Sequence, residues 1–222
     1  MWRKWSAQLA LMGNRERIDL RRSRPGLHPP PPVDLSERQL PTLLKSGPWF
    51  RLHKANREPL HFGSTGSNRF DAPGGEYRVL YLGGDAHCAF IETYGQSTGI
   101  SVVTTKALAE RSLTRVEAMR PLLLVDLTGR GLAQIGADER LCAGEHAVAQ
   151  RWALEFWRHP LRPDGLYYRA RHDPSRFCVA IFDRAADALR VTRRGSLLDS
   201  EQVPLLADIL DTYTFGLLEE GT

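Results

Sequence analysis

Three short strand-type segments follow one another late in the chain, with no helical pattern between them. They are Leu166–Arg169, Phe177–Phe182 and Leu189–Thr192. A doubly wound parallel sheet needs strands and helices to alternate along the chain. Consecutive strands do not fit that order, so the sequence favours an α+β fold over a parallel α/β fold.

The remaining elements are predicted from apolar spacing and from capping residues. Ser36 and Gln39 resemble a capping box, which predicts a short helix over residues 37–45. Asp85 is a suitable N-cap for a helix that runs to about Tyr94. Two further helices are predicted at His146–Trp157 and Glu201–Leu218, and four further strands at Trp49–His53, Tyr77–Leu82, Ile100–Thr105 and Leu122–Leu127.

A basic segment precedes the predicted body of the protein. Residues 1–24 carry a net charge of +5, whereas the rest of the chain carries −1. Residues 1–12 space their apolar side chains as a short amphipathic helix would. The proline-rich segment 24–34 cannot be a regular helix and is expected to be an extended connector. We therefore expect residues 1–47 to form an extension, either a solvated arm or a contact for nucleic acid or an acidic partner, and residues 48–222 to form one domain.

Composition argues against several classes of protein. No apolar run approaches the roughly 20 residues that a membrane span needs, and the apolar stretch 7–12 is too short for a signal peptide. Cys88, Cys142 and Cys178 lie far apart, as expected for buried, reduced thiols in a cytoplasmic protein. No His or Cys spacing suggests a metal site. Outside the basic segment, direct binding of nucleic acid is not expected, because that part of the chain has no net positive charge.

One serine lies in a G-x-S-x-G pattern, which is typical of a hydrolase nucleophile. The pattern is Gly95–Gly99, with Ser97 at its centre. A nucleophile elbow needs a strand before the serine and a helix after it. Here the predicted helix comes first and the predicted strand begins at Ile100, so a serine hydrolase based on Ser97 is disfavoured.

Four residues in the first half of the chain are of the types that act together on a nucleotide. Arg51 lies in a predicted strand, Arg69 in the glycine-rich loop Leu60–Gly75, Tyr81 in the next strand and Glu92 in the helix after it. Two guanidinium groups suit a pyrophosphate, because each can donate two parallel hydrogen bonds. A tyrosine ring offers a stacking surface for a base, and a carboxylate stabilises positive charge that develops on a ribose. Cleavage of a nucleotide N-glycosidic bond needs these groups.

The same part of the chain resembles the RES domain, the toxin component of RES–Xre toxin–antitoxin pairs. The resemblance runs from about Pro48 to Arg190. It rests on the segments FRLH (50–53), FGSTGSNRFDAPGG (62–75), VLYLGGDAHCAFIET (79–93), AQRWALEFWRHP (149–160) and DGLYYRARHDPSRFCVAIFDRA (164–185). It implies an ADP-ribosyltransferase-like fold, in which a split α+β sheet with flanking helices surrounds a cleft for NAD.

The resemblance also implies a chemistry. Members of the family degrade NAD by hydrolysis or phosphorolysis, without a metal, and some are reported to attach ADP-ribose to proteins. Arg51, Arg69, Tyr81 and Glu92 match the family's two arginines, tyrosine and glutamate. By this match, the arginines would bind the pyrophosphate, the tyrosine would stack near the nicotinamide and the glutamate would stabilise the ribosyl cation. The implied partner is an Xre-type helical antitoxin, and a homodimer is left open.

The chain departs from the family at one site residue. Relatives have a Y-R-S-R-H strand motif, whereas this chain has Ala170 at the serine position. The lost hydrogen bond is worth about 0.5–1.5 kcal/mol, which is up to about tenfold in rate. Ser64 or Ser67 could supply the hydroxyl in part. The alternative interpretation is a RES-type scaffold that binds a nucleotide or an antitoxin with little turnover.

Other residues near these motifs are expected to have packing roles. His53 is expected to be an exposed residue at a sheet edge, and Trp152 is expected to lie in the core. Tyr167 and Tyr168 are neighbours in one strand, so they should face opposite sides of the sheet. Arg171 and His172 end that strand; a role at the protein surface is favoured for them, and direct contact with a ligand is left open.

Overall fold

The structure is a computed structural model, and it describes residues 28–97 and 99–219. The amphipathic helix predicted over residues 1–12 and the basic segment 1–24 lie outside the described residues. Among the residues that the structure describes, no helix combines the length and the apolar character that a membrane crossing requires.

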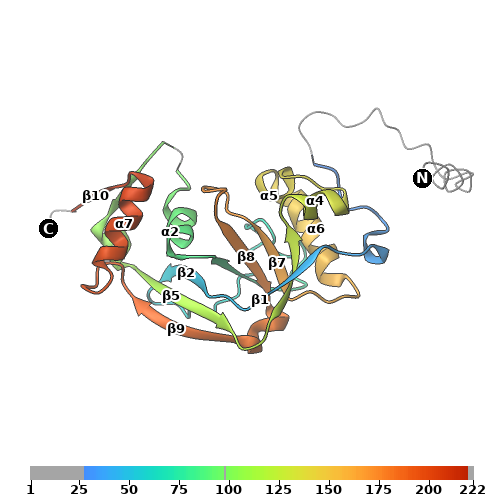
Figure 1. The fold of residues 1–222 in the computed structure, drawn as a ribbon, viewed down its shortest axis with the longest axis horizontal. Coiled ribbons are helices and arrows are strands. Elements are labelled where there is room, and N and C mark those ends of the chain that lie inside the picture. Colours follow the sequence, from blue (N-terminus) through green and yellow to red (C-terminus); the bar gives the residue numbers. More distant parts are fainter. Residues whose placement is uncertain (1–27, 98, 220–222) are drawn as a thin grey trace, which may run out of the picture.

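Eight strands form one curved sheet, in which β6 and β7 are the parallel pair and all other neighbours run antiparallel (Figure 1). Of the three late segments, Leu166–Arg169 and Phe177–Phe182 lie in neighbouring strands, whereas Leu189–Thr192 lies in a strand at the far edge, and this mostly antiparallel order is not that of a doubly wound sheet. In sheet order the strands are β1 (Thr42–Lys45), β6 (Leu122–Leu127), β7 (Gly165–Arg169), β8 (Phe177–Phe182), β3 (Val79–Gly83), β2 (Trp49–Lys54), β5 (Arg111–Ala118) and β9 (Leu189–Gly195).

The sheet is nearly divided between β2 and β3. These strands are joined at the single pair Phe50–Gly83, whereas β2 pairs with β5 along its whole length from Trp49 to Lys54. Likewise, β3 pairs with β8 from Val79 to Gly83. The two halves therefore diverge beyond one point of contact, and the predicted α+β fold with a split sheet and flanking helices is confirmed.

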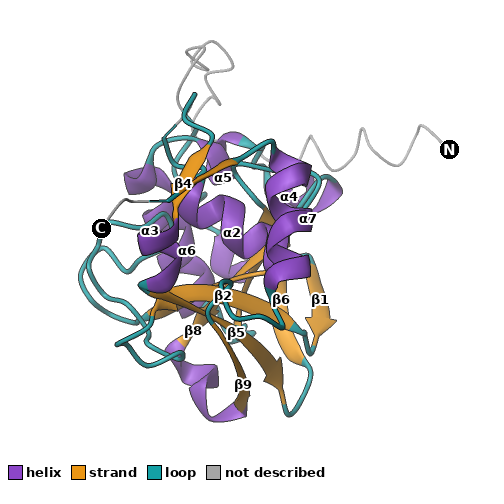
Figure 2. Ribbon diagram, turned by 90° about the vertical axis from the view of Figure 1, so that its left-hand side faces the viewer, coloured by secondary structure: helices purple, strands orange, loops and turns teal. Residues whose placement is uncertain are grey.

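The helices lie in two groups on one face of the sheet, one above each half (Figures 1 and 2). The group above β2 and β5 packs around Phe90, Leu113 and Ile209. The group above β6, β7 and β8 packs around Trp152, Phe156 and Phe182. The prediction that Trp152 lies in the core is therefore confirmed. The first group contains α2 (Ala86–Tyr94), α3 (Thr105–Ala109) and α7 (Val203–Tyr213), and the second α4 (Arg130–Ile135), α5 (Arg140–Ala143) and α6 (His146–Arg158).

The opposite face of the sheet has a core of its own. Trp49, Leu80 and Ile181 are buried there beneath the 3₁₀ helix η2 (Asp183–Ala188). Tyr167 packs on this side, whereas Tyr168 belongs to the core beneath α6. The prediction that these two tyrosines face opposite sides is therefore confirmed.

Residues 28–47 pack against the body as far as the structure describes them. A 3₁₀ helix η1 (Leu35–Glu37) buries Leu35, and β1 adds an edge strand to the sheet. The helix predicted over residues 37–45 is therefore wrong. Pro41 lies in the middle of that segment, where it removes a helical hydrogen-bond donor, and residues 42–45 instead satisfy their backbone by pairing with β6.

The chain end also differs from its prediction. The helix predicted over Glu201–Leu218 is α7, which ends at Tyr213 because Thr214 adopts a left-handed conformation with φ of 53°. Beyond it, β10 (Gly216–Leu218) pairs in parallel with β4 (Val102–Thr104). The sequence does not predict the strand β5, because polar residues interrupt its apolar run. Hydrogen-bonded pairing with β2 on one side and with β9 on the other stabilises the extended conformation of this segment.

Candidate active site

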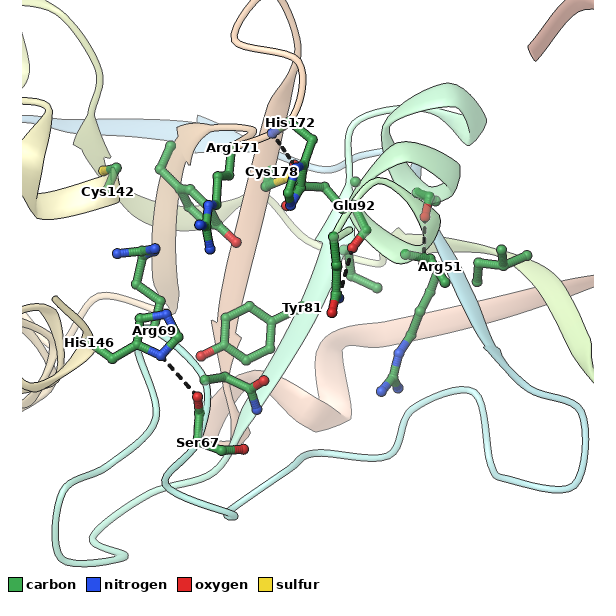
Figure 3. A pocket seen from close by; sticks show the side chains of 18 residues that line it. Arg51, Ser67, Arg69, Tyr81, Glu92, Cys142, His146, Arg171, His172 and Cys178 are labelled. Carbon is green, nitrogen blue, oxygen red and sulfur yellow. Dashed lines mark hydrogen bonds between the residues drawn. The ribbon is translucent and has the colours of Figure 1, made fainter. Parts of the chain in front are cut away.

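A cavity of about 570 Å³ opens above the divergence of β2 and β3, between the two groups of helices (Figure 3). The four residues singled out from the sequence line it together: Arg51 from β2, Arg69 from the glycine-rich loop, Tyr81 from β3 and Glu92 from α2. Ser67 lines the cavity as well. The single junction between the half-sheets therefore places four residues that are up to 41 positions apart in the sequence around one space.

The glycine-rich loop is folded around one buried carboxylate. Asp71 has no exposed surface, and its Oδ2 accepts hydrogen bonds from the Asn68 backbone N–H at 3.1 Å, the Asn68 amide at 3.0 Å and the Thr65 hydroxyl at 3.2 Å. Its Oδ1 accepts from the Tyr81 hydroxyl at 3.0 Å. A buried carboxylate needs such donors to offset its lost hydration. Asp71 therefore orders the loop and ties it to β3.

Arg69 is held at the cavity by backbone contacts. It is 9% exposed, and its Nη1 donates to the Gly144 carbonyl at 2.7 Å. On α6, His146 Nδ1 contacts the Ser67 carbonyl at 2.9 Å, and Gln150 donates to the carbonyls on either side of Ser67. The loop is thus fixed to the second helix group as well as to the sheet.

Arg51 lies on the other side of Glu92 from Arg69 (Figure 3). Its Nη1 donates to the carbonyls of Pro59 and His61, at 2.7 and 3.1 Å. Burial, together with the nearby charge of Arg57, lowers the pKa of Arg51 to about 10. The guanidinium therefore remains protonated at neutral pH.

Glu92 presents a carboxylate to the cavity from a helix of fixed orientation. The N-cap of α2 is the one predicted, since the Asp85 side chain accepts from the Cys88 backbone N–H at 2.7 Å. Glu92 Oε1 accepts from the backbone N–H of His172 at 2.9 Å. Its Oε2 has no hydrogen-bond partner within residues 28–97 and 99–219, so this oxygen remains available to a ligand.

The tyrosines and cysteines around the cavity are neutral. The Tyr81 hydroxyl accepts from the Phe70 backbone N–H at 2.9 Å and donates to Asp71, and burial raises its pKa far above the usual range. Its ring, and not its hydroxyl, is thus the part left for a ligand. Burial raises the pKa of the Cys142 thiol to about 12, and the pKa of Cys178, which lies beside Cys88, is also raised. Neither thiol is a thiolate nucleophile at neutral pH.

Two of the predicted binding residues do not line the cavity. Ser64 is exposed, and Ala170 is a buried residue (2% exposed) whose N–H donates to the Arg176 carbonyl. His53, predicted to be exposed, is also buried, at 4% exposure, because it is covered where β2 pairs with β5 and its Nε2 contacts the Thr114 hydroxyl at 2.9 Å. All three cysteines are buried and free, as predicted. Ser97 follows α2 and precedes β4, the order that excludes a nucleophile elbow.

Sequence reasoning missed His146 and Cys142 as cavity residues and left the roles of Arg171 and His172 open. Arg171 and His172 reach the cavity from the end of β7, His146 from the start of α6 and Cys142 from α5. The available signal was the pair of basic residues directly after a buried strand. Within residues 28–97 and 99–219, the cavity included, no group of three or more His, Cys, Asp or Glu side chains is arranged to hold a metal ion.

Comparison with known proteins agrees with this architecture. The sequence matches the RES domain family over residues 48–206. It is 32% identical over 123 residues to "Probable toxin y4kH" of Sinorhizobium fredii, an alignment that covers 55% of this chain and 94% of the relative. The structure is similar to a crystal structure of the M. tuberculosis MbcT–MbcA toxin–antitoxin complex, with a TM-score of 0.54 and 17% identity over 69% of this chain and 86% of that one. Because the family match covers most of the chain, the protein belongs to the RES domain family.

Proposed function

We propose that this protein is an NAD-degrading toxin of a toxin–antitoxin pair, and that it cleaves the bond between nicotinamide and ribose. The observation that carries the proposal is the cavity itself, in which the Glu92 carboxylate lies among cationic side chains and beside the Tyr81 ring. NAD presents the complementary groups: an anionic diphosphate, an aromatic pyridinium and a ribose on which positive charge develops.

In the proposed reaction, the C–N glycosidic bond breaks and its electron pair leaves with nicotinamide. The leaving group becomes neutral, so no general acid is needed. The ribose becomes an oxocarbenium-like cation, which the available oxygen of Glu92 stabilises. Water then attacks to give ADP-ribose and a proton, or phosphate attacks to give the ribosyl phosphate. Attack by a protein side chain would instead give an ADP-ribosylated protein.

Binding is assigned to the remaining residues that the family resemblance names. Arg51 and Arg69 supply positive charge toward the diphosphate, and the Tyr81 ring stacks near the nicotinamide. Ser64 and Ala170, the other two predicted binding residues, do not line the cavity, so Ser67 is the serine nearer to this role. The chemistry proposed here uses no metal.

The partner of the toxin is proposed to be an Xre-type helical antitoxin. The support is that one relative is named a probable toxin and that the similar crystal structure is a toxin–antitoxin complex. The loop Leu60–Gly75 is the proposed docking point, because it is exposed at Thr65–Asn68 beside the cavity. A cytoplasmic location, where NAD is available, completes the proposal.

The experiment is to incubate the purified protein with NAD, with and without phosphate, and to identify the products. Release of nicotinamide is the expected result, with ADP-ribose formed in buffer alone and a phosphorylated ribosyl product if phosphate is the acceptor. Binding of NAD without any loss of it would favour a nucleotide-binding scaffold. If NAD neither binds nor is consumed, the proposal is wrong.

The scaffold is kept as a second candidate because of Ala170, which lacks the hydroxyl of the family motif. Ala170 does not line the cavity, so a hydroxyl at position 170 can act only through a residue that does. Under the enzyme proposal, Ala170→Ser is expected to raise NAD turnover by up to about tenfold, the value of one restored hydrogen bond to such a residue. Steady-state NAD consumption by the two proteins measures this. A scaffold that merely binds would show no turnover in either protein.

A further inference from the structure

Two guanidinium groups project into the same part of the cavity. Figure 3 shows Arg69 and Arg171 side by side above the Tyr81 ring, while Arg51 lies beyond Glu92. Burial lowers the pKa of Arg69, and the charge of Arg171 lowers it further, which is the effect of a like charge nearby. Two cations at close range repel one another unless an anion lies between them.

Carboxylates neutralise other arginines of the protein but not this pair. Arg120 is paired with Asp164, and Arg176 with Asp85 and Asp173. The hydrogen bond of Arg69 goes instead to a backbone carbonyl. Across residues 28–97 and 99–219, Arg171 makes no hydrogen bond or ion pair with a side chain, and no carboxylate pairs with Arg69.

The acid nearest to the pair in the cavity does not neutralise it. Glu92 is the only carboxylate among the residues that line this cavity, and it binds the backbone N–H of His172. Besides the three arginines and Glu92, the ionisable groups there are two histidines, two buried thiols and two tyrosines. Burial raises the pKa of both tyrosines and of Cys142, and the contact with Cys88, together with burial, raises that of Cys178, so all four groups stay neutral. The site thus has cationic groups in excess and space beside them.

We propose that Arg69 and Arg171 bind the two phosphate groups of a diphosphate ligand between them, and that Arg171 is a further binding residue of this site. Guanidinium groups suit this role because their paired N–H groups match phosphate oxygens. Arg51 cannot close on the same diphosphate, since it lies on the far side of Glu92 and its Nη1 is held by two carbonyls. Its charge acts at longer range. The identity of the ligand as NAD rests on the proposed function, but the diphosphate site does not.

The test uses inorganic pyrophosphate as the probe, titrated into the full chain at low salt and followed by ³¹P NMR. Arg171→Gln is expected to raise the dissociation constant about 10–100-fold, the range for loss of one charged hydrogen-bonded pair. Arg171 is exposed, so its replacement leaves the fold intact. Arg171→Lys should restore part of the affinity, because it keeps the charge and loses the planar group.

Arg169→Gln is the matched control. It removes the same charge two residues away, but Arg169 donates to the Pro174 carbonyl and lies over the Phe177 ring, away from the cavity lining. Its dissociation constant should stay within about twofold of the parent value, since a remote charge acts weakly through solvent. If the parent does not bind pyrophosphate, or if the Arg169 and Arg171 variants lose affinity equally, the proposal is overturned. NAD consumption is measured separately: pyrophosphate binding that depends on Arg171, without NAD breakdown, would leave the diphosphate site standing and remove the proposed function.

Discussion

Replacing Glu92 with glutamine removes one negative charge from the cavity and keeps the shape of the side chain. The Glu92 Oε1 atom accepts from the His172 backbone N–H, and a glutamine carbonyl oxygen can accept the same hydrogen bond. The end of β7 therefore stays anchored to α2 in the variant. Any loss of activity then reports the missing charge at the second oxygen, and not a displaced strand.

The size of the effect follows from the charge that moves during the proposed reaction. A carboxylate and a unit positive charge about 4 Å apart attract one another by about 4 kcal/mol at an effective dielectric constant of about 20. NAD already carries a positive charge on its nicotinamide ring, so only the extra attraction in the transition state raises the rate. Loss of one preorganised electrostatic group usually costs about 2.7–4 kcal/mol. We expect Glu92→Gln to lower kcat by about 10²–10³-fold and to change NAD affinity much less.

Steady-state NAD consumption and calorimetric binding of NAD measure these two quantities. The matched control is Glu76→Gln, because Glu76 also accepts a backbone N–H, that of Gly74, but does not line the cavity. The control should retain the parent kcat, and both variants should unfold at the parent temperature. Turnover by Glu92→Gln within about twofold of the parent would refute a catalytic role for this carboxylate.

Three further outcomes are expected. Asp71→Asn should lower the free energy of unfolding by about 1–3 kcal/mol and should also lower NAD turnover, because an amide cannot accept from every donor that the Asp71 carboxylate satisfies, including the Tyr81 hydroxyl. Urea unfolding measures the first effect and NAD consumption the second. Burial alone would raise the pKa of Asp164, but its hydrogen bonds with Arg120 and with the Leu123 backbone N–H lower this pKa overall. The ionised carboxylate therefore stabilises the fold above the unfolded-state pKa of about 4, and this contribution is lost as the pH falls further. Urea unfolding of Asp164→Asn should accordingly show the full loss of stability at pH 7 and a smaller loss below about pH 4. A chain that lacks residues 28–47 should melt at a lower temperature in calorimetry than one that keeps them, because burial of Leu35 and Leu40 stabilises the fold by about 1.5–3 kcal/mol for each side chain.

Local signals in the sequence were sufficient for the segments that are apolar along their length or that carry a clear cap. The strands Leu122–Leu127 and Phe177–Phe182 have the predicted bounds, and the helix capped by Asp85 ends at Tyr94 as predicted. The strand β5 needed more than local signals. Its arginines and glutamate mask an alternation that is stabilised by a neighbour on each side, and such pairing is a property of the sheet and not of the segment.

The candidate site could be predicted only in part, for the same reason. The arginines, tyrosine and glutamate of the first half belong to recognisable motifs, and the structure brings all four to one cavity. The role of Arg171 was left open, because its position depends on how β7 pairs with β6 and β8. The buried state of Asp71 is equally invisible to sequence reasoning, since an aspartate in a glycine-rich loop would ordinarily be solvated.

The pairing of β3 with β8 governs when the cavity can exist during synthesis of the protein. The strand that carries Tyr81 is completed early, but its partner contains Ile181, opposite Leu80, and is translated much later. At about 5–20 residues per second, a ribosome needs about 5–20 s to go from the end of β3 to the end of β8. Until β8 has been made, β3 has no neighbouring strand on that side. Arg171 and His172 are made shortly before β8. A nascent chain is therefore without a formed cavity until β8 has been made, and any activity of this site begins only after that point.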